Sequence, residues 1–144
     1  MPFPDRIERD LELRHPPEKV WNALTTPAGL GSWFGSRAEI GDLRPGGTVR
    51  VWWGEDGPHT LWIQIVEPPR RFAFTWAIEG LPAGDPRRTR VEFELVPTTT
   101  GTRLTVVETG FAQLAAHSAT AYEGNVAGWS TELAELAEYL DAAA

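Results

Sequence analysis

Residues 122–140 read YEGNVAGWSTELAELAEYL. Apolar side chains recur in this segment at every third or fourth position, at Tyr122, Val126, Trp129, Leu133, Leu136 and Leu140. This spacing predicts a C-terminal helix of about five turns with one apolar stripe. The same periodicity places Glu132, Glu135 and Glu138 on its solvent side. Gly124 and Gly128 each cost ~1 kcal/mol in a helix relative to alanine, so they indicate either a close approach to a neighbouring element or a bend.

The apolar stripe needs a surface to pack against, and the upstream residues supply one. Between Arg37 and Thr109 the hydrophobic period falls to two, which is typical of half-buried strands. We therefore expect seven strands, at Ile7–Arg14, Arg37–Ile40, Thr48–Trp53, Thr60–Val66, Arg71–Ile78, Thr89–Val96 and Arg103–Thr109. Two short helices should follow the first strand, because proline suits the first turn of a helix. One spans Pro17–Thr25, and the second begins at Pro27 and carries Trp33 and Phe34.

These elements predict an α+β fold in a single domain over residues 1–144. Turns such as Pro45-Gly46-Gly47 and Glu55–Pro58 favour an antiparallel meander. A curved seven-stranded antiparallel sheet with one apolar face should wrap round the long C-terminal helix, because no other long helix is available to cover it. One helix is only ~10 Å wide. We therefore expect a cavity between the helix and the sheet, closed at one end by the two short helices.

Composition excludes several classes of function. The chain has no cysteine, which rules out disulfides, thiolate metal sites and cysteine nucleophiles. Its net charge of −7 disfavours nucleic acid and anionic lipid as partners. The charged N-terminal residues do not resemble a secretory signal. The longest charge-free stretch, Val20–Ser36, is shorter than the ~20 apolar residues of a membrane helix. We therefore expect a cytoplasmic protein with no membrane partner.

The sequence contains no recognisable catalytic or metal-binding motif. The histidines are His15, His59 and His117, and no two of them have the spacing of zinc ligands. Surface or structural roles are the expectation for all three, with proton transfer as the alternative. The glycine-rich turns lack the lysine and the helix of a phosphate-binding loop. We therefore expect no metal, no cofactor and no catalytic residue.

Two charged residues fall on inward faces of the expected sheet. Glu108 continues the alternation that begins at Leu104, and Arg9 shares the inward face of the first strand. If the first and last strands pair with Leu13 opposite Leu104, Arg9 stands opposite Glu108. An ion pair between them would relieve the cost of burying either charge alone. Such a pair either closes the sheet or forms the polar end of a ligand pocket.

The aromatic residues either fill the core or line an apolar cavity of the kind that small molecules occupy. Tyrosine and tryptophan are favoured as cavity residues because they bring a polar group to an apolar wall. The candidate ligand-binding residues are Arg9, Trp33, Phe34, Trp53, Phe74, Trp76, Phe93, Glu108, Tyr122 and Trp129. Trp52 and Trp62 fall on outward faces of adjacent strands, which indicates an apolar patch and a candidate homodimer interface.

Five short strings, in order along the chain, resemble the activator of heat-shock-protein-90 ATPase homologue family of the START-related (SRPBCC) superfamily. They are Pro16–Thr25 within Ile7–Trp33, Asp42–Gly47, Glu67–Phe72 with Phe74–Trp76, Thr102–Val106 with Gly110-Phe111, and Gly128-Trp129 with Leu133, Leu136 and Leu140. Together they extend over nearly the whole chain. The resemblance implies a helix-grip fold, which agrees with the fold expected from periodicity.

The superfamily includes lipid carriers, polyketide aromatase/cyclases and ring-hydroxylase subunits. The expected cavity and the resemblance together favour a small-molecule binding module for a hydrophobic or aromatic ligand. One alternative is an enzyme of the polyketide cyclase/dehydrase kind, in which a pocket orients a reactive chain and a Glu or His moves a proton. Another is a chaperone-partner or regulatory domain in the stress response. A chaperone is the less favoured partner, because eukaryotic chaperone activators carry an additional N-terminal domain that these residues do not include.

Overall fold

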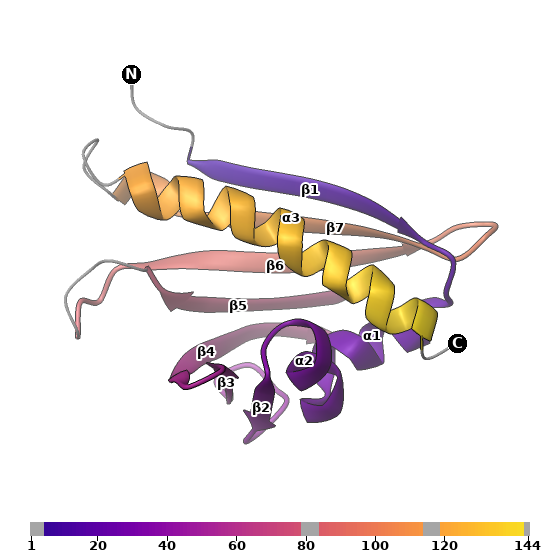
Figure 1. Ribbon diagram of the computed structural model, residues 1–144, viewed down its shortest axis with the longest axis horizontal. Helices are drawn as coiled ribbons and strands as arrows, with labels where there is room; N and C mark the ends of the chain where they lie inside the picture. Colours follow the sequence, from indigo (N-terminus) through magenta and orange to yellow (C-terminus); the bar gives the residue numbers. More distant parts are fainter. Residues whose placement is uncertain (1–4, 79–83, 114–118, 143–144) are drawn as a thin grey trace.

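The computed structural model describes residues 5–78, 84–113 and 119–142, and within them one seven-stranded antiparallel sheet is crossed by a long helix (Figure 1). In chain order the elements are β1 (Arg6–Leu13), α1 (Pro17–Thr25), α2 (Pro27–Trp33), β2 (Arg37–Ile40), β3 (Thr48–Trp53), β4 (Asp56–Glu67), β5 (Arg71–Ala77), β6 (Arg88–Pro97), β7 (Thr102–Thr109), a 3₁₀ turn η1 (Phe111–Gln113) and α3 (Ala119–Ala142). The predicted α+β helix-grip architecture is confirmed.

The strands lie in the order β1-β7-β6-β5-β4-β3-β2, and every neighbouring pair is antiparallel. The first strand therefore joins the last, and the rest follow as a meander. The turn expected at Glu55–Pro58 is wrong, because β3 and β4 continue until Trp53 pairs with Asp56. Gly54 has a φ of +62° and makes the tighter turn there, since glycine adopts this conformation without strain.

The register between β1 and β7 differs from the expectation by two residues. Arg9 lies opposite Val106, and Glu108 lies opposite Ile7. Both registers keep the same residues on the inward face, because side chains alternate with a period of two. Alternation alone therefore could not choose between them. The expected ion pair between Arg9 and Glu108 is wrong, and the Arg9 guanidinium instead donates to the backbone oxygen of Glu8 (2.8 Å).

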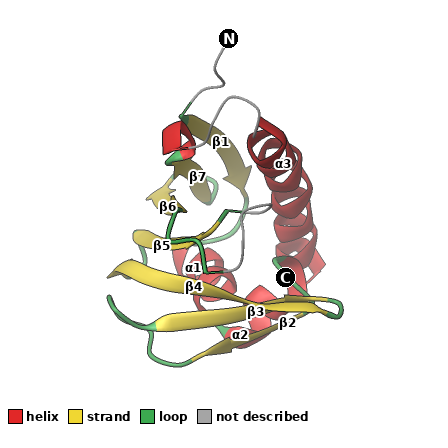
Figure 2. Cartoon of the chain, turned by 90° about the vertical axis from the view of Figure 1, so that its left-hand side faces the viewer, coloured by secondary structure: helices red, strands yellow, loops and turns green. Residues whose placement is uncertain are grey.

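Helix α3 lies across the concave face of the sheet, as the two perpendicular views show (Figures 1 and 2). Trp129, Leu133, Leu136 and Leu140 are buried, while Tyr122 and Val126 are half-buried against the same core. At the C-terminal end of the helix, His15 forms a hydrogen bond with Asp141 (2.8 Å). This bond joins the end of α3 to the residues that follow β1, so His15 has a structural role.

The short helices α1 and α2 pack tightly against each other below α3 (Figure 1). The indole N–H of Trp33 donates to the backbone oxygen of Ala23 (2.7 Å). Gly29 permits this contact, because a Cβ there would lie 2.6 Å from the same oxygen. Phe34 follows α2 directly and is buried beneath α3. None of the helices in the described residues is long and apolar enough to cross a membrane.

The contact between α3 and the sheet can be tested at Leu136, which has no solvent exposure. Leu136→Ala should lower the free energy of unfolding by about 2–5 kcal/mol, because it leaves a cavity in a packed core. Leu43 is 38% exposed, so the control Leu43→Ala should change the free energy of unfolding by less than about 0.5 kcal/mol. Urea unfolding measures both. Equally small losses for the two variants would show that α3 contributes little to the core.

Candidate functional site

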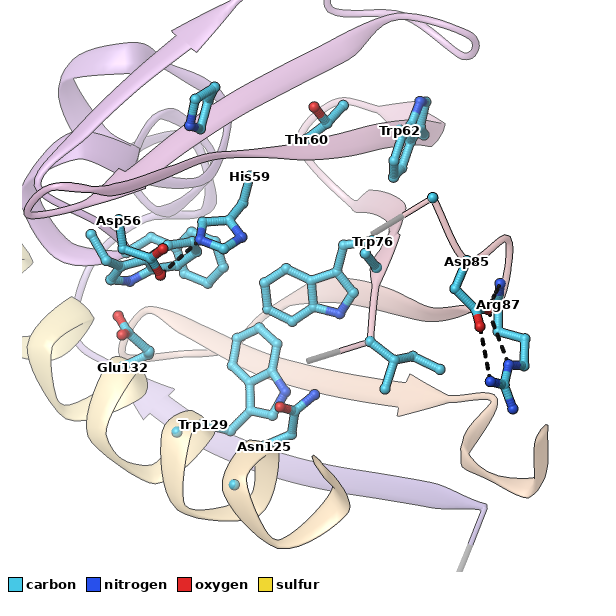
Figure 3. A pocket seen from close by; sticks show the side chains of 18 residues that line it. Asp56, His59, Thr60, Trp62, Trp76, Asp85, Arg87, Asn125, Trp129 and Glu132 are labelled. Carbon is cyan, nitrogen blue, oxygen red and sulfur yellow. Dashed lines mark hydrogen bonds and ion pairs between the residues drawn. The ribbon is translucent and has the colours of Figure 1, made fainter. Parts of the chain in front are cut away.

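A cavity of about 840 Å³ lies between α3 and the part of the sheet formed by β3, β4 and β5 (Figure 3). Its apolar lining includes Trp62 and four rings that cluster together, which we call the aromatic wall: Phe34, Trp53, Trp76 and Trp129. Its polar lining includes Asp56, His59, Asn125 and Glu132. The expected space between helix and sheet is therefore present, and it opens at the β3–β4 hairpin, where His59 is exposed.

The aromatic wall is built around Phe34. Its ring stacks on Trp76 (centroids 5.8 Å apart, interplanar angle 19°) and on Trp129 (5.9 Å, 25°). Trp53 meets it edge-on at 5.2 Å. Offset and edge-to-face geometries of this kind are the favoured arrangements of aromatic pairs. Three separate parts of the chain, the end of α2, the sheet and α3, therefore contribute to one continuous ring cluster.

Glu108 on β7 holds this wall in place from behind. Its carboxylate has no solvent exposure, and it accepts hydrogen bonds from the indole N–H groups of Trp76 and Trp129 (2.8 Å each). The amide of Asn125 donates to it at 2.9 Å, and the hydroxyl of Thr89 donates as well. Within the described residues all of these partners are neutral, so the carboxylate is held by hydrogen bonds rather than by an ion pair. Glu108 does not itself line the cavity, but three of its partners do.

The glycines of α3 leave room for the cavity. A Cβ on Gly124 or on Gly128 would meet no atom within 4 Å, and both residues line the cavity. The close approach to the sheet that their positions suggested is therefore not what the structure shows. With Glu132 they form a row spaced by four residues along one face of α3, beside the buried stripe that contains Trp129.

Glu132 lies in the cavity wall rather than in solvent, so the expected solvent position of this residue is wrong (Figure 3). Burial raises the pKa of its carboxyl to about 7, the neighbouring Glu135 carboxylate adds to the rise, and hydrogen bonding to the Trp53 side chain opposes it. Its Oε2 atom is shielded from solvent and has no hydrogen-bond partner in the described residues. The helical pattern missed it because Glu132 sits at the edge of the apolar stripe, next to the gap left by Gly128.

Polar groups border the cavity at two places. At the β3–β4 hairpin, His59 forms a hydrogen bond with Asp56 (3.0 Å), and its ring meets Trp53 edge-on at 5.2 Å. On the other side, Arg87 binds Asp85 through two nitrogens (3.0 and 2.9 Å). The Arg87 guanidinium and backbone N–H lower the pKa of the Asp85 carboxyl to about 2. The charge of Arg87 is therefore already matched within the protein (Figure 3).

The structure brings together four of the ten candidate ligand-binding residues, namely the aromatic wall. Trp33, Phe74 and Phe93 are buried core residues that do not line the cavity. Tyr122 packs edge-on against Phe111 (5.1 Å), and Arg9 lies on β1, away from the cavity lining. Sequence reasoning missed Asn125 and Glu132 as cavity residues. The four-residue spacing of Gly124, Gly128 and Glu132 could have indicated that this face of the helix lines a cavity. His117 lies outside the described residues.

Arginine side chains partly cover Trp52 and Trp62, and the homodimer interface expected at these residues stays a prediction. Trp52 is covered by the guanidinium groups of Arg37 (4.4 Å) and Arg50 (5.9 Å), and Trp62 by that of Arg88 (3.5 Å). Both tryptophans are half-buried. Cation–π contacts of this kind let a strand expose a large ring beneath a charged group.

Among the described residues, no three His, Asp or Glu side chains gather in an arrangement that could hold a metal ion. The site is thus a cavity with aromatic walls and a small number of polar groups, which is the general form of a small-molecule site.

A curved sheet that grips a long helix, with a cavity between them, defines a helix-grip domain. The model of the family described as "Activator of Hsp90 ATPase homolog 1-like protein" matches residues 14–141, and the chain belongs to this family. No curated protein matches the chain significantly.

Solved structures share the fold over nearly the whole chain. Protein MLL2253 from Mesorhizobium loti is 29% identical, with a TM-score of 0.80 over 94% of this chain and 96% of that one. DynU16, a protein in the dynemicin biosynthetic locus, is 25% identical, with a TM-score of 0.78 over 96% of this chain and 48% of that one. The Aha1 dimer from Colwellia psychrerythraea is 20% identical, with a TM-score of 0.74 over 94% of this chain and 95% of that one.

The role of Glu108 as an anchor for the aromatic wall can be tested with Glu108→Gln. An amide replaces one acceptor oxygen by a donor, so at least one buried N–H or O–H loses its partner. The free energy of unfolding should fall by about 1–3 kcal/mol. Glu94→Gln, on the exposed face of β6, removes the same charge as a control and should have little effect. Denaturant unfolding measures both, and an equal effect of the two variants would contradict the anchor role.

The buried position of Glu132 predicts a pH-dependent effect of Glu132→Gln. A carboxyl whose pKa rises on folding destabilises the protein as pH rises above the unfolded value, and the cost is complete above the folded value of about 7. The variant should therefore be more stable than the unmodified protein at pH 8 but not at pH 5. Solvent screening at this half-buried site reduces the difference to on the order of 1 kcal/mol.

Urea unfolding of both proteins at the two pH values measures this difference. The control is Glu138→Gln, an exposed position on the same helix, whose effect should be the same at both. A pH-independent effect of Glu132→Gln would show that its carboxyl titrates as in water.

Proposed function

We propose that this chain is a small-molecule binding module whose ligand, hydrophobic or aromatic, occupies the cavity between α3 and the sheet. The observation that carries the proposal is the cavity of about 840 Å³ with its aromatic wall. Ligand sites commonly measure ~300–1,000 Å³ and are lined mainly by apolar and aromatic side chains. From the sequence we also propose that the protein is cytoplasmic and that residues 1–144 form a single domain.

Preorganisation supports the proposal. Trp76 and Trp129 are fixed by hydrogen bonds to Glu108, and the buried ring of Phe34 contacts both. A ligand that stacks against these rings does not have to order them, so it loses less conformational entropy on binding. The bonded N–H groups also leave the rings as apolar surface toward the cavity. A flat or apolar molecule fits such a wall better than a strongly hydrated one.

An enzyme of the cyclase/dehydrase kind is the second candidate, and Glu132 favours it. A carboxyl with a pKa of about 7 is suited to proton transfer near neutral pH. The structural similarity to a protein in the dynemicin biosynthetic locus is a further argument. Mass spectrometry of a bound ligand before and after incubation separates the two candidates, because a binding module returns the ligand unchanged. A chaperone-partner role rests on the family description, and a homodimer on the dimeric relative.

The cavity can be blocked with Gly128→Leu. A side chain at this position extends into open space, and leucine also favours the helix over glycine by roughly 1 kcal/mol, so the fold should be kept. The neutral apolar dye N-phenyl-1-naphthylamine, followed by its fluorescence, should bind the unmodified protein with 1:1 stoichiometry. Binding to the variant should be at least about tenfold weaker, a loss of roughly 1.4 kcal/mol.

Ala127→Leu provides the matched control. It adds the same side chain one position earlier, on the exposed side of α3, and should bind the dye as the unmodified protein does. Equal binding by the Gly128→Leu variant would place the dye elsewhere and contradict the proposal, as would the absence of binding to the unmodified protein.

A further inference from the structure

Among the acidic groups that line the cavity, Glu132 is the one without a basic partner in the described residues. Arg87 is paired with Asp85, and His59 is bonded to Asp56. Glu132 has no ion pair in the described part of the chain, and its Oε2 lacks any hydrogen-bond partner there. A buried carboxylate oxygen without a donor is costly. The cavity therefore contains one carboxyl that is hydrogen-bonded to the Trp53 side chain but has no cationic partner in the described residues.

The aromatic wall adds to this preference for positive charge. The faces of tryptophan and phenylalanine rings carry negative electrostatic potential and attract cations. Trp76 is half-buried and its indole N–H donates to Glu108, so a ligand meets the ring of Trp76 rather than its donor. An aromatic wall beside an unpaired carboxylate is the combination that recognises an ammonium group on an apolar body.

We infer that the ligand of this cavity carries a protonated amine on its aromatic or apolar body, and that the Glu132 carboxylate binds this nitrogen. The inference rests on the proposed function and specifies the class of ligand. A neutral hydroxyl would satisfy the free oxygen but leave the negative charge unmatched. An anion would meet Glu132 without a free cation, since Arg87 is held by Asp85. The terminal torsion of a glutamate rotates broadly, so either oxygen can turn toward the cavity.

Binding of a cation should be linked to the ionisation of Glu132. The titratable groups around it are Glu135 on α3 and, across the cavity opening, Asp56 and His59 on β4. Since the pKa of Glu132 is about 7 without ligand, the binding form is scarce at pH 6 and dominant at pH 8. Affinity for an amine should therefore rise about tenfold between these values, while affinity for a neutral analogue should not change.

The test uses three probes of one shape: 4-phenylbutylamine, 4-phenylbutanol and 4-phenylbutyrate. Their dissociation constants are measured at pH 6 and pH 8 from the shifts of the tryptophan indole N–H signals in NMR titrations. The amine should bind at least about tenfold more tightly than the alcohol at pH 8, and the carboxylate most weakly. In the Glu132→Gln variant the amine should lose its advantage over the alcohol and the pH dependence of its binding.

Two further variants make the result specific. Glu138→Gln removes one negative charge from the exposed side of the same helix and should leave the preference for the amine intact. His59→Asn removes the imidazole that lies at the cavity opening. If the pH dependence disappears in the His59→Asn variant and persists in Glu132→Gln, the inference is wrong. Circular dichroism of each variant confirms that it is folded.

The outcomes separate this inference from the proposed function. If amine and alcohol bind equally at pH 8, or if the carboxylate binds most tightly, the inference of an amine ligand is wrong. The proposed binding function is not affected by that result. Failure of all three probes and of the naphthylamine dye counts against the cavity as a ligand site, and the amine falls with it. A preference for the amine that survives in Glu132→Gln overturns the role of this carboxylate.

Discussion

The Glu108 carboxylate connects more of the molecule than any other polar group described here. It lies on β7 and accepts hydrogen bonds from Trp76 on β5, Thr89 on β6, and Asn125 and Trp129 on α3. A carboxylate is an acceptor only, and four donors surround it, so its position is matched to its chemistry. Because such a group tolerates neither loss of a donor nor entry of a second acceptor, it fixes how α3 lies on the sheet. The same bonds set the orientation of two rings of the aromatic wall.

The fold was predictable because its signals are local and periodic. The stripe from Tyr122 to Leu140 gave the long helix, and alternation gave every strand to within a few residues. Register was not predictable in this way, since a shift of two residues keeps the inward face unchanged. The position of Arg9 relative to Glu108 depended on that register. Its partner was therefore assigned wrongly although the inward face of Glu108 was correct.

Cavity residues were predictable only where an aromatic residue also falls on the inward face of its element. Phe34, Trp53, Trp76 and Trp129 are inward aromatic residues, and they line the cavity. Trp33, Phe74 and Phe93 have the same pattern but are covered by other rings, and only three-dimensional packing separates the two groups. Glu132 was missed for the opposite reason. A glutamate beside an apolar stripe normally faces water, and the gap over Gly124 and Gly128 reverses that expectation.

The two sides of the cavity come from distant parts of the chain. The residues around His59 belong to the β3–β4 hairpin, while those around Trp129 belong to the last helix. Strands β1 and β7 must also meet before the sheet is complete. During synthesis, the sheet residues that line the cavity therefore emerge from the ribosome well before helix α3. A nascent chain cannot retain a small molecule in this space until α3 has been made and has docked, so occupancy would mark the completion of folding.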